Sequence, residues 1–348
     1  MLLSPFVPTE ILRIKPAEVY LSVPQRYGNY NFIGNRIAEG GEVDILLISG
    51  SNTHTGFDSN FIAEHLEKRL NREVHVLNFG ASWYGAEVDL TRLADALTTI
   101  KPKIVLLPDA DVGFYFPHEL SRYVWRHPPK YQPAGLSIIE RATLYGTAML
   151  GAPNLTYAAI AKIWERPIRP DLRAYMQRYE DSSGYQAEPF GWLSHHNPDR
   201  ENRLPYNPKD YTLPDIPLEA TKFNGVEDEN FEFRSYTYNK YQSAFISMMA
   251  EVAEEHGAQF AMVSMPTHFG PGYSKDEPAE RAWVRLFSEG YERDWPTIGV
   301  SMRQLFPDLT FDEMKQYYSN ETHLNDKGAQ IFNLAIIPVL EQMLRNVR

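Results

Sequence analysis

The sequence predicts a three-layer α/β/α sandwich, and two observations carry this prediction. Short apolar runs typical of buried strands alternate with segments whose apolar residues fall on one helical face, and the alternation begins near Val43. Strands that are separated by helices favour parallel pairing with right-handed crossovers. The chain has 348 residues, of which 43% are hydrophobic, so it is long enough for one large domain with a sizeable core.

The first three strands follow one another without interruption. Residues 43–49 form a short apolar run with little alternation, which indicates a buried strand. Asp58 or Ser59 can cap the next helix, because both side chains accept hydrogen bonds from free N–H groups in a first turn. The elements expected after it are a strand at 74–77, a helix over about 88–100 and a strand at 104–107.

The pattern breaks after the third strand and returns near residue 236. We expect a helix over 236–256, a strand at 260–265, a helix over about 277–290, a weak strand at 297–302 and a helix from Asp326 to about Leu344. The prediction is therefore a flavodoxin-like, mostly parallel sheet of about five strands with a large insertion. Its parts are an irregular segment at 1–42, an α/β domain at 43–124 and 233–348, and an insertion or subdomain at 125–232.

Composition excludes several classes of function. The net charge is −11, and no cluster of Lys and Arg is present, so a nucleic-acid partner is not expected. The absence of cysteine excludes disulfides, thiolate metal sites and a cysteine nucleophile. No apolar run is long enough for a transmembrane segment, and the start of the chain is not expected to be a signal peptide because it lacks a basic leader.

Polar or small residues follow each expected strand. Because ligands bind at the carboxyl ends of strands in an open α/β sheet, we expect these residues to gather in one crevice. They are Ser51 and Asn52 after the first strand, Asn78 and Gly80 after the second, Asp109 and Asp111 after the third, and His268 after the fourth.

Ser51 and His323 form the most informative pair in the chain. A serine hydroxyl becomes a nucleophile when a base takes its proton, and imidazole is the usual base near neutral pH. Ser51 follows the first strand in Ser49-Gly50-Ser51-Asn52, and His323 lies shortly before the last helix. The alternative for Ser51 is a helix cap. The N–H groups of Ser51 and Gly80 could donate to the oxyanion that such an attack creates.

This order of motifs resembles the SGNH hydrolase superfamily of GDSL-like esterases and O-acyltransferases, in particular a branch whose first block reads Gly-Ser-Ser. Ser49-Gly50-Ser51 occupies the first block, and Gly80 matches the glycine of the second block. The last block corresponds to Asn320-Glu321-Thr322-His323-Leu324-Asn325-Asp326-Lys327-Gly328. The resemblance covers roughly 43–112 and 236–346, and it implies Ser51 as nucleophile and His323 as base.

Two positions depart from the family pattern. The third block normally supplies an asparagine to the oxyanion, but Pro108-Asp109-Ala110-Asp111 has none, so Asn52 or Asn78 would have to substitute for it. The acid that precedes the histidine by three residues is replaced by Asn320. Glu321 could orient the imidazole instead, and Asp109 or Asp111 is the alternative.

The resemblance implies an esterase or O-acyltransferase that acts on acyl groups, acetyl included, of a glycan or small ester. No cofactor or metal is expected, and Asp109, Asp111 and His268 are candidates for substrate binding. Many members of the Gly-Ser-Ser branch work beside a membrane acyltransferase, which implies such a partner. The resemblance implies an extracytoplasmic setting if an N-terminal signal or anchor has been removed, and a cytoplasmic one otherwise. The alternative is a catalytically degenerate protein that binds glycan or serves as an assembly subunit.

Overall fold

The computed structural model describes residues 15–20, 30–81, 85–109, 136–144, 146, 240–265, 295–298, 300, 305–306, 308–318 and 323–347. Among these residues, five strands form one sheet in the order β2-β1-β3-β4-β5, and every neighbouring pair is parallel. The strands are β1 (Gly41–Leu47), β2 (Val76–Asn78), β3 (Ile100–Asp109), β4 (Gln259–Ser264) and β5 (Thr297–Ile298). This confirms the predicted α/β sandwich with a flavodoxin-like parallel sheet.

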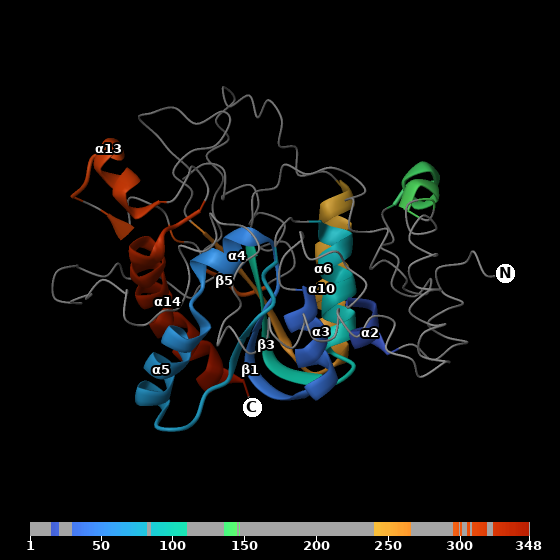
Figure 1. Ribbon diagram of the computed structural model, residues 1–348, viewed down its shortest axis with the longest axis horizontal. Helices are drawn as coiled ribbons and strands as arrows, with labels where there is room; N and C mark the ends of the chain where they lie inside the picture. The colour runs from blue at the N-terminus through green and yellow to red at the C-terminus, as the bar shows by residue number, and fades with distance from the viewer. Residues whose placement is uncertain are drawn as a thin grey trace, which may run out of the picture.

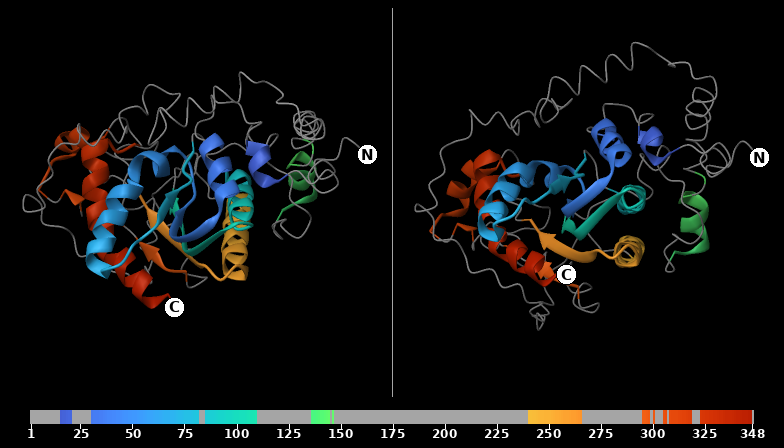
Figure 2. Two further views of the ribbon diagram at one scale, coloured as in Figure 1. Left: turned by 60° about the horizontal axis from the view of Figure 1, so that its bottom comes forward. Right: turned by 90° about the horizontal axis from the view of Figure 1, so that it is seen from below.

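Helices cover both faces of the sheet (Figure 1). The described helices are α2 (Pro16–Tyr20), α3 (Tyr30–Glu39), α4 (Ser51–Gly56), α5 (Ser59–Leu70), α6 (Ala86–Ala96), α10 (Lys240–Glu255), α13 (Phe311–Met314), the 3-10 helix η6 (Lys315–Tyr317) and α14 (Asp326–Asn346). The two views in Figure 2 place α5 and α14 on one side of the sheet and α6 and α10 on the other.

The core is divided between the two faces because side chains alternate along each strand. Leu46 and Ile48 of the first strand and its exit pack with residues of α3, α6 and α10. Ile45 and Leu47 pack with residues of α5 and α14. Strands of this kind read as continuous apolar runs, since both faces are buried.

Side-chain caps fix the two helices that flank the first face. Asp58 caps α5 and accepts a hydrogen bond from Phe61 N–H at 3.0 Å, which resolves the choice between Asp58 and Ser59. Asn325 caps α14 and accepts a hydrogen bond from Gly328 N–H at 3.0 Å. Gly328 must be small, since a Cβ there would lie 2.2 Å from the carbonyl oxygen of Tyr317.

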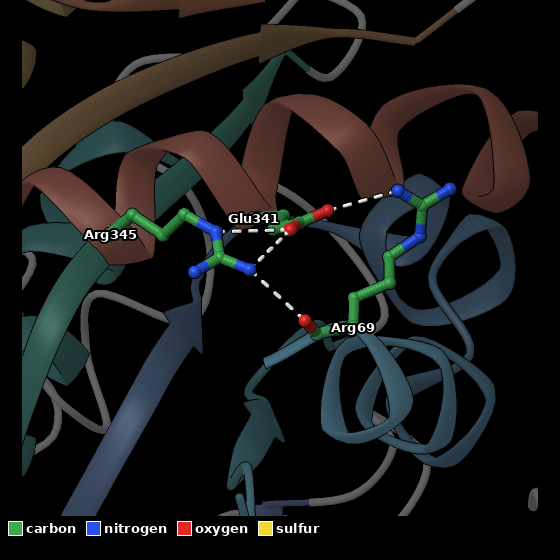
Figure 3. A network of polar contacts seen from close by, with 3 residues as sticks. All are labelled: Arg69, Glu341 and Arg345. Carbon is green, nitrogen blue, oxygen red and sulfur yellow. Dashed lines mark hydrogen bonds and ion pairs between the residues drawn. The ribbon is translucent and has the colours of Figure 1, made fainter. Parts of the chain in front are cut away.

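An exposed ion-pair network joins the same two helices at the surface (Figure 3). Glu341 of α14 accepts hydrogen bonds from Arg69 of α5 at 2.9 Å and from Arg345 at 2.8 Å. Arg345 also donates to the carbonyl oxygen of Arg69 at 3.0 Å. These hydrogen bonds lower the pKa of the Glu341 carboxyl, the Arg345 contribution being the larger.

Three features differ from the sequence prediction. Residues 1–42 were expected to be irregular, but α2 and α3 form there, because Tyr30, Ile33 and Ile37 share one helical face and are buried. The short helix α4 was not expected, and of the strand predicted at 297–302 the described part is β5 at Thr297–Ile298, with residue 300 outside it. The expected helix over 277–290 and most of the insertion at 125–232 lie outside the described residues.

One part of the expected insertion contributes to the core. Residues 138–144 are helical, and Leu136 and Leu144 are buried in the same cluster as the side chains of α6 and α10. None of the helices in the described part of the chain is sufficiently long and apolar to cross a membrane.

Candidate active site

Ser51 is the first residue of α4, directly beyond the exit of β1. The neighbours of β1 are β2 on one side and β3 on the other, so the chain direction across the sheet reverses here. Such a switch point opens a crevice at the carboxyl ends of the strands. Gly50 occupies the N-cap position of α4, and no side chain caps the helix there. Ser51 therefore does not serve as the helix cap, which was the alternative role for its side chain.

The Ser51 hydroxyl contacts the imidazole of His323. The distance between Ser51 Oγ and His323 Nε2 is 2.8 Å, although the two residues are 272 positions apart in the sequence. With the ring proton on Nδ1, Nε2 accepts the hydroxyl proton of Ser51, which is the tautomer that general-base catalysis requires. His323 is 9% exposed, so this contact is largely shielded from water.

The capped start of α14 holds His323 in place. His323 lies two residues before the N-cap Asn325, whose side chain donates to the carbonyl oxygen of Gln316 at 2.7 Å. Leu324 forms an isolated antiparallel bridge with Tyr318. Burial raises the pKa of the Tyr318 hydroxyl well above its ordinary value.

A buried asparagine joins α14 to the helix that carries Ser51. Asn333 of α14 donates to the carbonyl oxygen of Gly56, at the end of α4, at 3.1 Å. The same amide also donates to the carbonyl oxygen of Ala329 at 2.6 Å. Asn333 is fully buried, so the relative position of the two helices depends on a hydrogen bond that water cannot replace.

Asn78 and Gly80 are brought to the site, but their hydrogen-bonding groups are already in use. The Asn78 amide donates to the carbonyl oxygens of Thr53 and Phe57, both at 3.0 Å. Its carbonyl oxygen accepts the Gly80 N–H at 2.7 Å. These two residues were expected to donate to an oxyanion, but in this arrangement their donors hold α4 against the end of β2.

The glycine at position 80 has a steric reason of its own. A Cβ on Gly80 would lie 2.4 Å from the backbone nitrogen of His54 and 2.8 Å from its Cα. Only a glycine lets the loop after β2 approach α4 this closely. The glycine matched to the second family block is therefore required for packing against the Ser51 helix.

The N–H groups at the start of α4 remain available. The first N–H groups of a helix have no intrahelical acceptor, and those of Ser51 and Asn52 form no other backbone bond among the described residues. The Asn52 side chain is 4% exposed, and its Oδ1 has no hydrogen-bond partner in the described part of the chain. Among the described residues, the backbone N–H groups of Ser51 and Asn52 are thus without a backbone acceptor, whereas the Gly80 N–H and the Asn78 amide are engaged.

The remaining candidates cannot be placed in the site. Asp109 is the last residue of β3, where its backbone pairs with Ser264 at the carboxyl edge of the sheet. Glu321, Asp111 and His268 lie outside the described residues. No group of three or more His, Asp or Glu side chains suited to a metal ion occurs among the residues that the structure describes.

Arg92 is a residue of this region that sequence reasoning missed. Its side chain on α6 is fully buried and donates to the carbonyl oxygens of Ser49 and Phe79. In the sequence, Arg92 lies beside Leu93 and Ala94 within an apolar helical pattern, and a solvated position is the usual expectation for arginine. No local motif identifies it, because its acceptors are backbone atoms of two distant loops.

Comparisons with known proteins add no assignment. No family model matches the chain, and no curated protein matches its sequence.

Proposed function

We propose that this chain is an SGNH-type serine hydrolase or O-acyltransferase that acts on ester-linked acyl groups, with Ser51 as nucleophile and His323 as base. The observation that carries the proposal is the 2.8 Å contact between Ser51 Oγ and His323 Nε2 at the switch point of a parallel sheet. A hydroxyl and an imidazole at this distance have the geometry of nucleophile and general base.

The reaction would proceed through an acyl-enzyme. His323 Nε2 takes the Ser51 hydroxyl proton while Oγ attacks the ester carbonyl, and the resulting oxyanion is stabilised by the N–H groups of Ser51 and Asn52 or by the Asn52 side chain. The intermediate then collapses, and His323 returns the proton to the departing alcohol. Water or a sugar hydroxyl, deprotonated by His323 in turn, attacks the acyl-enzyme and releases Ser51.

The substrate class comes from the resemblance in the motifs around Ser51, Gly80 and His323. An acylated glycan, acetyl esters included, fits the family to which these motifs are similar, and a membrane acyltransferase is the matching partner. No step of this mechanism requires a cofactor. Glu321 is the proposed residue for orienting the imidazole.

The experiment is active-site labelling with a fluorophosphonate, together with hydrolysis of a chromogenic acetyl ester. We expect the wild-type chain to be labelled and Ser51→Ala to abolish labelling. His323→Asn should slow labelling by about 10²- to 10⁴-fold, since it removes the general base. Ser59→Ala is a matched control, because Ser59 is likewise the first residue of a helix, and its buried Oγ has no partner among the described residues.

A second function is favoured by one specific observation. The bonds that occupy the Gly80 N–H and the Asn78 amide reduce the number of free oxyanion donors, which suits a degenerate member that binds glycan or assembles with a partner. Complete absence of labelling and turnover in the folded wild-type chain supports this second function. Labelling that persists in Ser51→Ala contradicts the nucleophile assignment.

A further inference from the structure

Arg92 is a buried charge whose contacts converge on the two loops of the candidate site. It lies on α6, where all eleven residues are buried, and forms an ion pair with Asp89 one turn earlier. Both side chains are fully buried. Burying an arginine costs free energy unless its charge is paired and its N–H groups find acceptors. The groups that accept hydrogen bonds from the Arg92 guanidinium therefore matter.

The acceptors are the backbone carbonyls at the exits of β1 and β2. Arg92 donates from Nη1 to the carbonyl oxygen of Phe79 and from Nη2 to that of Ser49, both at 2.9 Å. Ser49 precedes Ser51 by two residues, and Phe79 directly precedes Gly80. The Ser49 carbonyl also accepts the Ala81 N–H at 3.1 Å. The guanidinium therefore completes a junction between the two loops.

We propose that Arg92 is a positioning residue for Ser51. By holding the carbonyls of Ser49 and Phe79 at a fixed separation, it sets the direction in which the chain enters α4 and thereby the approach of Ser51 Oγ to His323. This role rests on the proposed function, because it gives the junction a catalytic consequence. An arginine suits it better than a lysine, since the planar fork directs two N–H donors at fixed angles.

A purely stabilising role makes a different prediction. Buried ion pairs can often be exchanged for well-packed apolar side chains without unfolding the protein. If Arg92 served only the fold, this exchange at Asp89 and Arg92 would leave the reactivity of Ser51 unchanged in the folded variant, although the carbonyls of Ser49 and Phe79 lose their arginine donor. If Arg92 positions Ser51, the same exchange keeps the fold and lowers the reactivity of Ser51.

The experiment compares Arg92→Lys and the double variant Asp89→Val/Arg92→Met with the wild-type chain. The measurements are the fluorophosphonate labelling rate of Ser51, kcat and KM for an acetyl ester, and the unfolding midpoint in urea. We expect labelling and kcat to fall at least tenfold in both variants while KM changes less than twofold, since substrate contacts are not altered.

The matched control is Arg345→Lys. Arg345 also combines an acidic partner on its own helix, Glu341, with a backbone carbonyl acceptor, that of Arg69 (Figure 3). Unlike Arg92, it is 55% exposed and lies at the opposite end of α14 from His323. We expect this variant to label at the wild-type rate. A folded Arg92 variant that also labels at the wild-type rate overturns the proposal, and so does the failure of both Arg92 variants to fold, which would make Arg92 a stability residue.

A separate measurement distinguishes failure of this proposal from failure of the proposed function. If the wild-type chain itself is not labelled, the nitrogen resonances of the His323 ring still report its contact with Ser51. Positioning by Arg92 predicts that these resonances move in Arg92→Lys and stay in place in Arg345→Lys. Unchanged resonances in a folded Arg92→Lys chain overturn the positioning role whether or not the chain is an enzyme.

Discussion

At each end of the strands one buried charged side chain links neighbouring segments, Asp44 near the amino ends and Arg92 at the carboxyl ends, but the charged partners of Asp44 are exposed whereas the contacts of Arg92 are buried. Near the amino ends of the strands, Asp44 of β1 accepts hydrogen bonds from Lys103 Nζ at 2.8 Å and from His75 N–H at 2.9 Å, and it pairs with Arg72 at 2.9 Å. The Arg72 and Lys103 side chains are 37% and 45% exposed. At the carboxyl ends, Arg92 is 0% exposed.

This difference in exposure predicts that substitutions near the amino ends change stability alone, whereas substitutions at the carboxyl ends also change the position of Ser51. Water can solvate Arg72 and Lys103 when Asp44 is lost, so a change at the amino edge costs free energy of folding without displacing a loop. At the carboxyl edge, neither Arg92 nor the Asn78 amide can exchange its partners for water. Substitutions there should change the geometry around Ser51 as well as stability, and the following predictions test that contrast.

Asn78→Ala should have the largest effect. It removes all three hydrogen bonds that join β2, α4 and Gly80. The Phe57 carbonyl loses its side-chain donor, and the Thr53 carbonyl keeps only the Phe57 N–H at 3.2 Å. We expect a loss of about 3 kcal/mol or more in the free energy of unfolding. Urea denaturation measures this loss, and Ser51 labelling should fall with it.

The matched variant for that position is Asn78→Asp. It keeps an acceptor for the Gly80 N–H but removes both donors to α4. We expect it to lower Ser51 labelling nearly as much as Asn78→Ala, since the attachment of α4 is lost in both. Wild-type labelling in a folded Asn78→Asp chain would contradict the view that this edge positions the nucleophile.

Asn333→Ala should come next in size. The variant deletes the donor that joins α14 to the Gly56 carbonyl of α4, and we expect a loss of about 1–3 kcal/mol, with slower labelling because His323 is carried by the start of α14. Gln330→Leu is the control on the same helix: Gln330 is also buried and its side-chain oxygen, like that of Asn333, has no partner among the described residues, but no hydrogen bond from its amide to α4 occurs among them. Equal effects of the two substitutions would argue against a specific link between the helices.

Asp44→Asn tests the contacts near the amino ends of the strands. Burial raises the pKa of the Asp44 carboxyl, but the hydrogen bonds from Arg72, Lys103 and His75 N–H outweigh it and place the pKa below its ordinary value. The stabilisation is therefore present above the unfolded pKa of about 3.9 and is lost as the pH falls through the folded value. We expect the variant to be about 1.5–3 kcal/mol less stable at pH 7.

The pH dependence and the labelling rate decide this prediction. The stability difference between Asp44→Asn and the wild-type chain should shrink as the pH falls from 5 toward 3, which urea midpoints at several pH values measure. Labelling of Ser51 at pH 7 should be unchanged in the folded variant. A loss of labelling would show that both edges position the nucleophile, and the contrast between them would be wrong.

The sequence predicted the sheet well because its signals are local. Each central strand is a compact apolar run, and caps such as Asp58 and Asn325 act within three residues of their own position. The contact between Ser51 and His323 was also foreseen, because strand-end positions converge in a parallel sheet. Helix α3 was missed, since its apolar positions lie in a stretch rich in Pro, Tyr and Asn that obscures the period.

The hydrogen-bonding state of the site could not be read from the sequence. Asn78 and Gly80 were assigned as donors from their positions, but whether an N–H group is free depends on which side chain the fold brings next to it. Arg92 was missed for a similar reason. Its role depends on the carbonyls of Ser49 and Phe79, and a backbone carbonyl is present at every residue of any sequence.

Glu341→Gln should have the smallest effect on the free energy of unfolding, because the hydrogen bonds and ion pairs that it removes are exposed. Arg69 and Arg345 are 46% and 55% exposed, so water and salt screen their pairing with Glu341. We expect a loss of no more than about 0.5–1 kcal/mol, and less in 1 M salt. Because hydrogen bonds from Arg345 and Arg69 lower the Glu341 pKa, this small contribution is present above the ordinary pKa of about 4.3 and disappears as the pH falls through the folded value. Urea midpoints at low and high salt measure it, and a loss that 1 M salt leaves unchanged would mean that exposure does not set the strength of these ties.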